Sequence, residues 1–474
     1  MDKLSRELQE TDQRVRVNRD TEVQRIQKCI EKTVLTIFKR VKDIDNRLSL
    51  RLRKVGSYYD GLKIGLPDEF DFLAEIDNLS EGTNVVVRST GFNGTKNLWK
   101  TPNGQPGRRK LQYVGTELHD MERKDDDYNW LKQTGTKRNP EYLIDCISVK
   151  NTFYFAVLQV VKSFTAEDLP RYLSVGEEPT FMHGPAVTLE FIWNGRAYKN
   201  LVISVDLTVC IKLNDWKKCF DTFEWMVEDS SIWTTLQNAL DVYGYHLTPY
   251  ISDRGHSCQW RVSTSFTEHL LMDSFSCESK LKTAIRCLKY QRDRLIANIP
   301  DTTDMTDQNF ANVIRFVRFY SGADEEQQLV SSYMIKTTAL VTLGLLSKKL
   351  YVQIPLSVLY SYFIIRLYTL IKYGELRMFF ISDYKLRVPA FGDILPGFKD
   401  LVYSINEEDI PVIEKKLSKG DNSKTYNEDE LEFNETRYVF TKMKADVTRH
   451  YEVCWRGEID FVPNLHSEIL MPSK

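Results

Sequence analysis

The chain has little net charge and lacks the marks of a secreted protein. Its 64 basic residues nearly balance 66 acidic ones, which excludes a wholly basic nucleic-acid coat, so any such surface must be a local patch. The eight cysteines include no CxxC pair and no disulfide framework. The amino terminus is charged and has no apolar run, so we expect no secretory signal. A reducing compartment follows, by default the cytoplasm.

Long hydrophobic runs are also missing. The most apolar stretch, residues 354–371, contains Arg366 and falls short of the roughly 20 residues that span a bilayer. We expect a buried helix there and no membrane association. With 42% hydrophobic and 12% aromatic residues, the composition is that of a globular protein. The 474 residues allow two to three domains or one two-lobed unit.

The amino-terminal part of the chain is predicted to be helical. Residues 1–54 contain no Pro or Gly, and apolar residues follow a 3.6-residue period between positions 23 and 41. This pattern predicts one long amphipathic helix that ends near Gly56.

The rest of the chain divides into a mixed part and a helical part. Residues 93–109 are predicted to form a surface loop, and residues 264–417 to be mostly helical. A polar segment, 420–430, precedes the last residues. Strands are predicted at residues 70–76, 153–158, 187–193 and 201–211. We therefore predict an α+β fold with a spine helix and an α/β core over residues 1–262, and a helical carboxy-terminal lobe over residues 263–474.

Two acidic residues stand in the strand predicted after Pro67. Because side chains alternate along a strand, Glu69 and Asp71 share one face, while Phe70 and Phe72 share the other. Neighbouring carboxylates repel each other, and a divalent cation relieves that repulsion. Mg²⁺ is commonly held by one or two carboxylates together with substrate phosphates. The alternative is that both are solvated strand residues.

A third carboxylate lies far away in the sequence. Asp206 interrupts the apolar strand predicted at 201–211, and a charge in such surroundings needs a partner. If this strand lies beside the first, three carboxylates converge. That arrangement suits a two-metal site for in-line displacement at phosphorus.

A glycine–serine pair precedes the acidic strand. Gly56 permits close approach of the backbone to an anion, and Ser57 adds a hydroxyl to neighbouring N–H groups that can cradle phosphate. The alternative for Gly56 is the carboxy-terminal cap of the long helix. The two interpretations are compatible.

The segment 56–71, GSYYDGLKIGLPDEFD, closely resembles the signature of cGAS and cGAS-like receptors, in which a GS pair precedes a P-x-E-F-D strand. Further matches follow in the expected order: VDLT at 205–208, W-R-x-S-x-S at 260–265, CLKY at 287–290 and SSYxxKT at 331–337. The resemblance covers about residues 50–340, and roughly the last hundred residues match nothing. We infer a nucleotidyltransferase of this family.

The resemblance implies two successive nucleotidyl transfers that join ATP and GTP into a cyclic dinucleotide like 2′3′-cGAMP. Glu69, Asp71 and Asp206 would be catalytic and hold Mg²⁺ or Mn²⁺ ions. The implied nucleotide-binding residues are Gly56, Ser57, Thr208, Arg261, Ser263, Ser265, Glu268, Lys289, Ser332 and Tyr333. For each of these, a purely structural role is the alternative.

The chain departs from vertebrate cGAS in its zinc-binding thumb. Between Glu268 and Lys289 it has only His269, Cys277 and Cys287, which do not make a tetrahedral zinc site. We expect no zinc, and DNA sensing is in doubt because the thumb grips duplex DNA. Zinc-less invertebrate receptors resemble this chain better, and some respond to double-stranded RNA.

Clusters of basic residues offer a nucleic-acid surface. Arg47, Arg51 and Lys54 crowd the end of the first predicted helix, and Lys282, Arg286 and Lys289 form one helical stripe. A-form RNA is bound mainly through shape and backbone, so we expect double-stranded RNA rather than DNA as activator, in antiviral innate immunity. A solvated charged face is the alternative.

Other functions stay open at this point. A catalytically silent relative would act as a scaffold, and another synthase would use other triphosphates, such as UTP and ATP, or make linear products. Retention of Glu69, Asp71 and Asp206 with the GS pair favours an enzyme. The bases joined, the linkage, the activator and a ligand-induced dimer are not determined.

Overall fold

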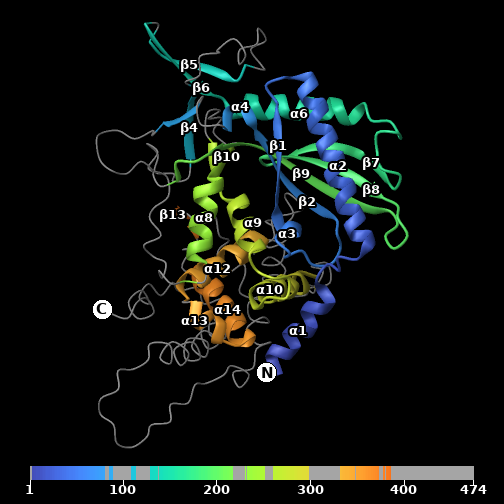
Figure 1. Ribbon diagram of the computed structural model, residues 1–474, viewed down its shortest axis with the longest axis vertical. Helices are drawn as coiled ribbons and strands as arrows, with labels where there is room; N and C mark the ends of the chain where they lie inside the picture. The colour runs from blue at the N-terminus through green and yellow to red at the C-terminus, as the bar shows by residue number, and fades with distance from the viewer. Residues whose placement is uncertain are drawn as a thin grey trace, which may run out of the picture.

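The computed structural model describes residues 3–80, 85–88, 108–113, 129–136, 138–216, 230, 232–250, 260–297, 331–346, 348–372, 377–378 and 381–385. A large sheet forms the upper part of the molecule and helices gather below it (Figure 1). The predicted α+β class is confirmed. The boundary at 262/263 stays a prediction, and one cluster of buried apolar side chains includes residues from both sides of it.

The predicted single helix over residues 1–54 is wrong. Two helices form, α1 (Lys3–Val15) and α2 (Thr21–Ile44). Asp20 caps α2 by accepting from the N–H groups of Glu22 and Val23, each at 2.9 Å, so it competes with continuous helix. After α2 the chain turns into strand β1 (Leu50–Val55), whose alternating sequence suits a strand at the edge of the sheet.

The centre of the sheet is built from parallel strands β2 (Glu69–Ile76) and β9 (Leu201–Leu213). β1 pairs antiparallel with β2 on one side. On the other side of β9, antiparallel β8 (Ala186–Trp193) carries β7 (Leu173–His183). The strands predicted at 70–76, 187–193 and 201–211 are therefore confirmed. Their buried faces are apolar, as a sheet with a covered face requires.

The sheet continues past β9 through β10 (Tyr245–Pro249) and β11 (Trp260–Ser263). Next come β4 (Arg108–Tyr113), β6 (Asn139–Ile144) and β5 (Leu131–Thr136), while β3 (Val85–Arg88) pairs with β4. Of the loop predicted at 93–109, only the last two residues are described, and they begin β4; the remainder lies outside the described residues.

The strand predicted at 153–158 is wrong, because these residues lie in helix α6 (Cys146–Lys162). Asp145 caps the helix by accepting from the N–H of Ile147 at 3.2 Å. Cys146, Val149 and Phe153 are buried at helical spacing and belong to the core. The short aromatic run looks like a strand when read alone, and only a longer window shows the 3.6-residue period.

The helices below the sheet are α8 (Trp233–Tyr243), α9 (Ser265–Asp273), α10 (Lys280–Ala297), α12 (Ser332–Leu345), α13 (Lys348–Gln353) and α14 (Leu356–Lys372). α1 lies beside α10 at the base of the molecule (Figure 1). A short hairpin, β12 (Arg377–Met378) and β13 (Ile381–Lys385), follows. The helical prediction is confirmed over the described residues up to 372. The segment 420–430 lies outside the described residues.

Helix α14 contains most of the apolar stretch at 354–371. Val358, Tyr360 and Phe363 are buried in the shared core, which confirms the predicted buried helix. Within the described residues, no helix has the length and apolarity needed to cross a membrane.

Candidate active site

A cavity of about 400 Å³ lies where the sheet meets the helical part. Strands β1, β2, β8, β9, β10 and β11 contribute to its wall, as do α9, α10, α12 and the short helix that follows β1. The cavity gathers residues that lie up to 281 positions apart in the sequence, from Val55 to Lys336. The predicted residues that line it are Gly56, Ser57, Glu69, Asp71, Asp206, Thr208, Arg261, Ser263, Ser265, Lys289, Ser332 and Tyr333.

The three predicted catalytic carboxylates come from the two central strands. Asp71 lies directly opposite Asp206 in the parallel register, and Glu69 is two residues earlier on the same face. Thr188 of β8 donates to Asp206 Oδ1 at 2.6 Å, and Lys63 donates to Glu69 Oε2 at 2.6 Å. The fold therefore brings all three carboxylates to one cavity wall.

Charge within this group is unevenly balanced. Burial, together with the nearby charges of Glu69 and Asp206, raises the pKa of Asp71 well above its ordinary value. Burial acts in the same direction on Glu69, but the Lys63 ammonium, with Lys289 behind it, holds the pKa of Glu69 below its ordinary value. At Asp71, burial and these two negative charges outweigh the opposing charge of Lys63.

The donor set fits a divalent cation, although the side chains are turned toward protein partners. Among the described residues, no three His, Cys, Asp or Glu side chains are grouped closely enough to hold a metal ion. Glu69 faces Lys63 and Asp206 faces Thr188. The carboxylate oxygens on the two adjacent strands are ligands that Mg²⁺ or Mn²⁺ prefers. Such an ion would relieve the repulsion that raises the pKa of Asp71. Binding would require Glu69 to leave Lys63.

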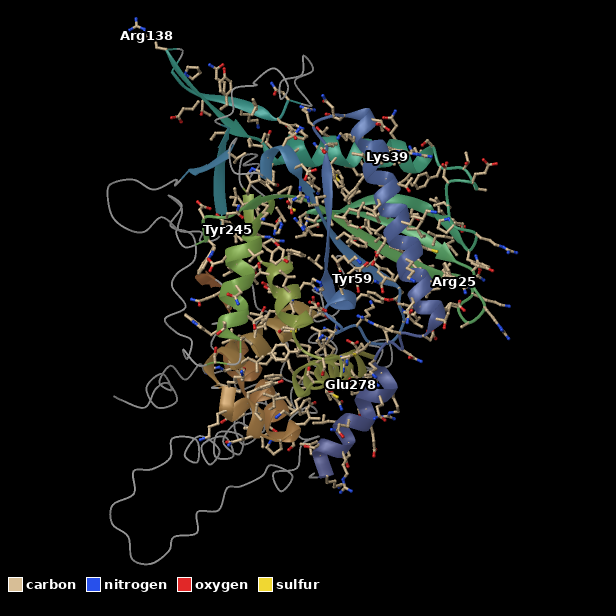
Figure 2. All side chains as sticks on the ribbon, in the orientation of Figure 1. Arg25, Lys39, Tyr59, Arg138, Tyr245 and Glu278 are labelled. Atoms are coloured by element: carbon tan, nitrogen blue, oxygen red, sulfur yellow. The ribbon has the colours of Figure 1, made fainter. Side chains whose placement is uncertain are left out.

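Gly56 opens a short helix, α3 (Gly56–Tyr59), immediately after β1. It therefore does not cap a long helix, and that interpretation is wrong. Its φ is +82°, and a Cβ there would lie 1.8 Å from Asp71 Oδ2, so only glycine fits. Tyr59, labelled in Figure 2, is buried between α3 and α2 and donates to Glu31 Oε1 at 3.1 Å. The GS turn is thus anchored next to the carboxylates.

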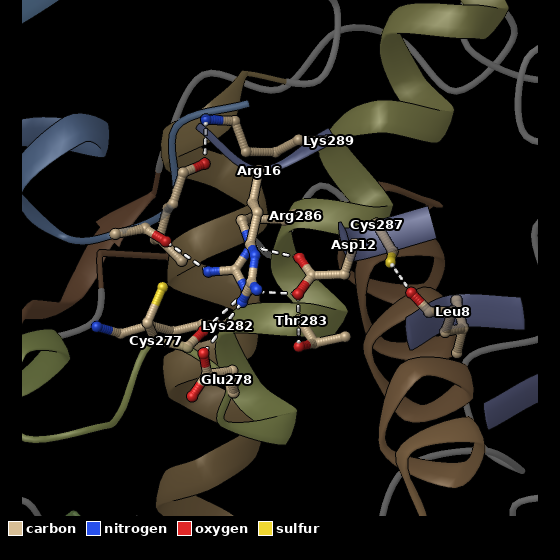
Figure 3. A network of polar contacts seen from close by, with 12 residues as sticks. Leu8, Asp12, Arg16, Cys277, Glu278, Lys282, Thr283, Arg286, Cys287 and Lys289 are labelled. Atoms are coloured by element: carbon tan, nitrogen blue, oxygen red, sulfur yellow. Dashed lines mark hydrogen bonds and ion pairs between the residues drawn. The ribbon is translucent and has the colours of Figure 1, made fainter. Parts of the chain in front are cut away.

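Two predicted phosphate ligands approach from α10 and α12. Lys289 is 4% exposed and donates to the carbonyl oxygen of Leu62 at 3.1 Å (Figure 3). Burial first, then the charges of Arg292 and Lys63, lowers the pKa of Lys289 to about 8. Ser332 Oγ accepts from Arg292 at 3.1 Å. Lys289 and Ser332 thus line the same cavity as the three carboxylates.

Glu268 is the predicted nucleotide-binding residue that does not line the cavity. It is fully buried, accepts from Thr264 Oγ1 at 2.8 Å and lies 2.7 Å from Lys336 Nζ. Because α9 begins at Ser265, its first turn carries Glu268 inward. The prediction of direct contact is therefore corrected: Glu268 lies behind the cavity wall.

Residues Asp60 and Lys336 also line the cavity, and sequence reasoning gave neither a role. Both stood inside matched segments, at 56–71 and 331–337. Their charge among apolar neighbours was the available signal, since such charges are buried only when paired. Ser263 and Ser265 lie on the same wall, where the hydroxyl of the first donates to the second at 3.2 Å.

The predicted basic stripe on α10 faces the interior. Arg286 is fully buried, donates to Asp12 Oδ2 at 2.8 Å and to the carbonyl oxygen of Gly61 at 2.6 Å, and Lys282 beside it is 5% exposed (Figure 3). Neither belongs to a nucleic-acid surface. The helical spacing was right, but α1 covers this face of the helix.

Of the other basic cluster, Arg47 is also buried, paired with Asp45 at 2.7 Å, so its assignment to the surface is wrong. Arg51 and Lys54 lie on β1 rather than on a helix, with side chains 48% and 42% exposed. The two remain accessible to a partner, although Arg51 pairs with Asp77 at 3.0 Å and Lys54 with Glu31 at 2.8 Å.

The sheet, with its carboxylates on adjacent strands beside a GS turn, defines a nucleotidyltransferase-type domain. Residues 58–274 match the family model of the Mab-21 protein nucleotidyltransferase domain. This segment of the chain is therefore similar to that nucleotidyltransferase domain family. The matched segment includes Glu69, Asp71 and Asp206, whereas Lys289 and Tyr333 lie beyond it.

Proposed function

We propose that this chain is a metal-dependent nucleotidyltransferase of the cGAS-like type that makes a cyclic dinucleotide. The observation that carries the proposal is the register of Asp71 opposite Asp206, with Glu69 on the same face, in one cavity with the GS turn. Three carboxylates retained at such a place favour catalysis over a silent scaffold, because an unbalanced acidic cluster is costly without a function.

The chemistry is a displacement at phosphorus. A ribose hydroxyl of one nucleotide attacks the α-phosphorus of another. The bond between that phosphorus and the oxygen that bridges to the β-phosphate breaks, and pyrophosphate leaves. Mg²⁺ or Mn²⁺ held by Glu69, Asp71 and Asp206 would supply neutralisation of the triphosphate charge. Asp206, oriented by Thr188, would position the hydroxyl and take up its proton.

The remaining cavity residues would hold the nucleotides. Ser57, Lys289 and Ser332, which all line the cavity, would bind the triphosphate. Tyr333 would stack on a base, which contributes ~1–3 kcal/mol on single-strand stacking platforms. Arg261 lies on the β11 wall, where it would reach a second base or phosphate. The linear product then rebinds in the reversed orientation in the same cavity, and a second transfer closes it into a ring.

ATP and GTP are the proposed substrates, with another pair such as UTP and ATP as the second candidate. The test is incubation with each labelled triphosphate pair, Mg²⁺ or Mn²⁺, and duplex RNA or duplex DNA. We expect a product that resists phosphatase, because a cyclic dinucleotide has no terminal phosphate. A phosphatase-sensitive product would establish a linear synthase, and no product under any condition would overturn the proposal.

Duplex RNA remains the proposed activator in the cytoplasm, on a smaller surface than the sequence predicted. Arg51 and Lys54 lie on β1, which leads directly into Gly56, so a ligand there could bias the GS turn. Replacing both with Glu should weaken the RNA response several-fold and leave unstimulated activity unchanged. Binding should also fall steeply with salt. An unchanged RNA response would remove this surface and leave the catalytic proposal standing.

A further inference from the structure

A buried ionic cluster lies at the cavity wall, between α3 and α12. The ammonium of Lys336 lies 3.2 Å from Asp60 Oδ2 and 2.7 Å from Glu268 Oε2. Asp60 and Glu268 are 1% and 0% exposed, and Nδ1 of His269 lies 3.1 Å from Asp60 Oδ1. Removing one member of such a buried cluster leaves an uncompensated charge, so the cluster holds its members firmly in place.

One end of this cluster belongs to the GS turn. Asp60 directly follows α3, and its N–H donates to the carbonyl oxygen of Gly56 at 3.0 Å. Two residues later, the N–H of Leu62 donates to the carbonyl oxygen of Ser57 at 2.8 Å. The position of Gly56 and Ser57 therefore depends on where Asp60 is held.

The other end belongs to the proposed base platform. Tyr333 precedes Lys336 by three residues, which places both side chains on one face of α12. The Tyr333 hydroxyl donates to Glu268 Oε1 at 3.4 Å, and the Lys336 ammonium lies 5.7 Å from the centroid of the ring. Burial, then the charge of Glu268, raises the pKa of Tyr333, so its hydroxyl stays a donor. The ring is thus held by the same cluster.

From these contacts we infer that Lys336 is a positioning residue. By pairing with both Asp60 and Glu268, it fixes the GS turn relative to the Tyr333 ring, so that the phosphates and the base of one nucleoside triphosphate bind together. The affinity for the nucleotide is higher because the GS turn and the Tyr333 ring are already aligned with each other before the nucleotide binds. The inference rests on the proposed function and adds to it the coupling between the two halves of the nucleotide site.

The test compares two probes on the variant Asp60→Asn. This change keeps the shape of the side chain, removes its charge and leaves Lys336 paired with Glu268. The probes are the non-reacting analogue α,β-methylene-ATP and inorganic tripolyphosphate, titrated calorimetrically with Mg²⁺. We expect the affinity for the ATP analogue to fall about tenfold, within the usual range of coupling between sites. Affinity for tripolyphosphate, which has no base, should change much less. An equal loss for both probes, or no loss, would overturn the inference.

A matched control comes from another buried ion pair. Asp45→Asn removes the charge that pairs with Arg47, and neither residue lines the cavity. It should lower the melting temperature without changing the ratio of the two affinities. A changed ratio in this control would mean that general loosening explains the effect, and the inference would fall.

A double-mutant cycle separates coupling from independent damage. Asp60→Asn and Tyr333→Ala should be non-additive for the ATP analogue, because each removes the same joint contact. Additive losses would contradict the inference. Product formation is measured on the same preparations. If the wild-type protein forms product but the cycle is additive, only the inference fails; if it binds neither probe and forms no product, the proposed function fails as well.

Discussion

Arg286 and Asp71 are both ionisable groups inside this protein, and they are compensated differently. Arg286 is surrounded by acceptors: both carboxylate oxygens of Asp12 and the carbonyl oxygens of Gly61 and Cys277 (Figure 3). Asp71 instead faces Glu69 and Asp206, which share its negative charge. A buried charge that serves only the fold is matched by its surroundings, whereas the acidic cluster leaves a deficit that a cation and a triphosphate would complete.

The largest expected effect is on product formation. Replacing Glu69 and Asp71 together with Ala should abolish the cyclic product, because the proposed cation ligands are lost. Thermal unfolding should shift little or toward higher temperature, since like charges are removed. Product made by this double variant at the wild-type rate would show that the acidic cluster is not catalytic.

Breaking the ion pair between Asp12 and Arg286 should lower stability more than activity, which is the opposite of the effect expected at the acidic cluster. Asp12→Ala leaves the buried guanidinium of Arg286 without its carboxylate, and the free energy of unfolding should fall by about 3–5 kcal/mol. Denaturant titration gives this value. Activity per folded molecule should be less affected than stability. A variant of wild-type stability would mean that the carbonyl acceptors alone suffice for Arg286.

Two glycines with similar backbone angles offer a matched comparison. Gly56 and Gly65 have φ of +82° and +77°, but a Cβ on Gly56 would collide with Asp71, whereas nothing lies within 4 Å of one on Gly65. Gly65→Ala should cost about 1 kcal/mol of stability from backbone strain alone. Gly56→Ala should cost more and also remove activity, because it displaces the carboxylate. If Gly56→Ala and Gly65→Ala changed activity equally, the close approach of Gly56 to Asp71 would have no role in activity.

The smallest effect concerns pH. With its pKa lowered to about 8, Lys289 is charged at pH 7 and largely neutral at pH 9. Because a triphosphate favours the charged form, affinity for the ATP analogue should fall as pH rises through 8. Calorimetric titration at pH 7 and pH 9 measures the difference. Lys289→Arg, which stays charged, should flatten the profile, and a similar fall in that variant would assign the titration to another group.

Local patterns predicted the acidic strand well. Alternation placed Glu69 and Asp71 on one face and Phe70 on the other, and the structure has this arrangement. The strand that carries Asp206 was also predicted, because both runs are long enough to show their period. The sequence did not predict that these two strands pair; the convergence of the three carboxylates was conditional on it. Parallel neighbours in a sheet can be far apart in the chain.

The errors share a physical cause. The spacing of Lys282 and Arg286 correctly placed both on one helical face, but periodicity does not say whether that face meets solvent or another helix. Asp12, which pairs with Arg286, lies 274 residues away, and only the packing of α1 against α10 makes the stripe interior. The same holds for Glu268, turned inward toward Lys336.

The sequence by itself determined which side chains share a face and which chemical groups the chain can offer, because both depend on local geometry and residue type. Only the tertiary structure decided which of those groups meet. It joined Asp71 to Asp206 and Asp60 to Lys336 through strand pairing and helix packing. Burial, charge balance and shifted pKa values arise from those long-range contacts, so they exist only once the chain has folded.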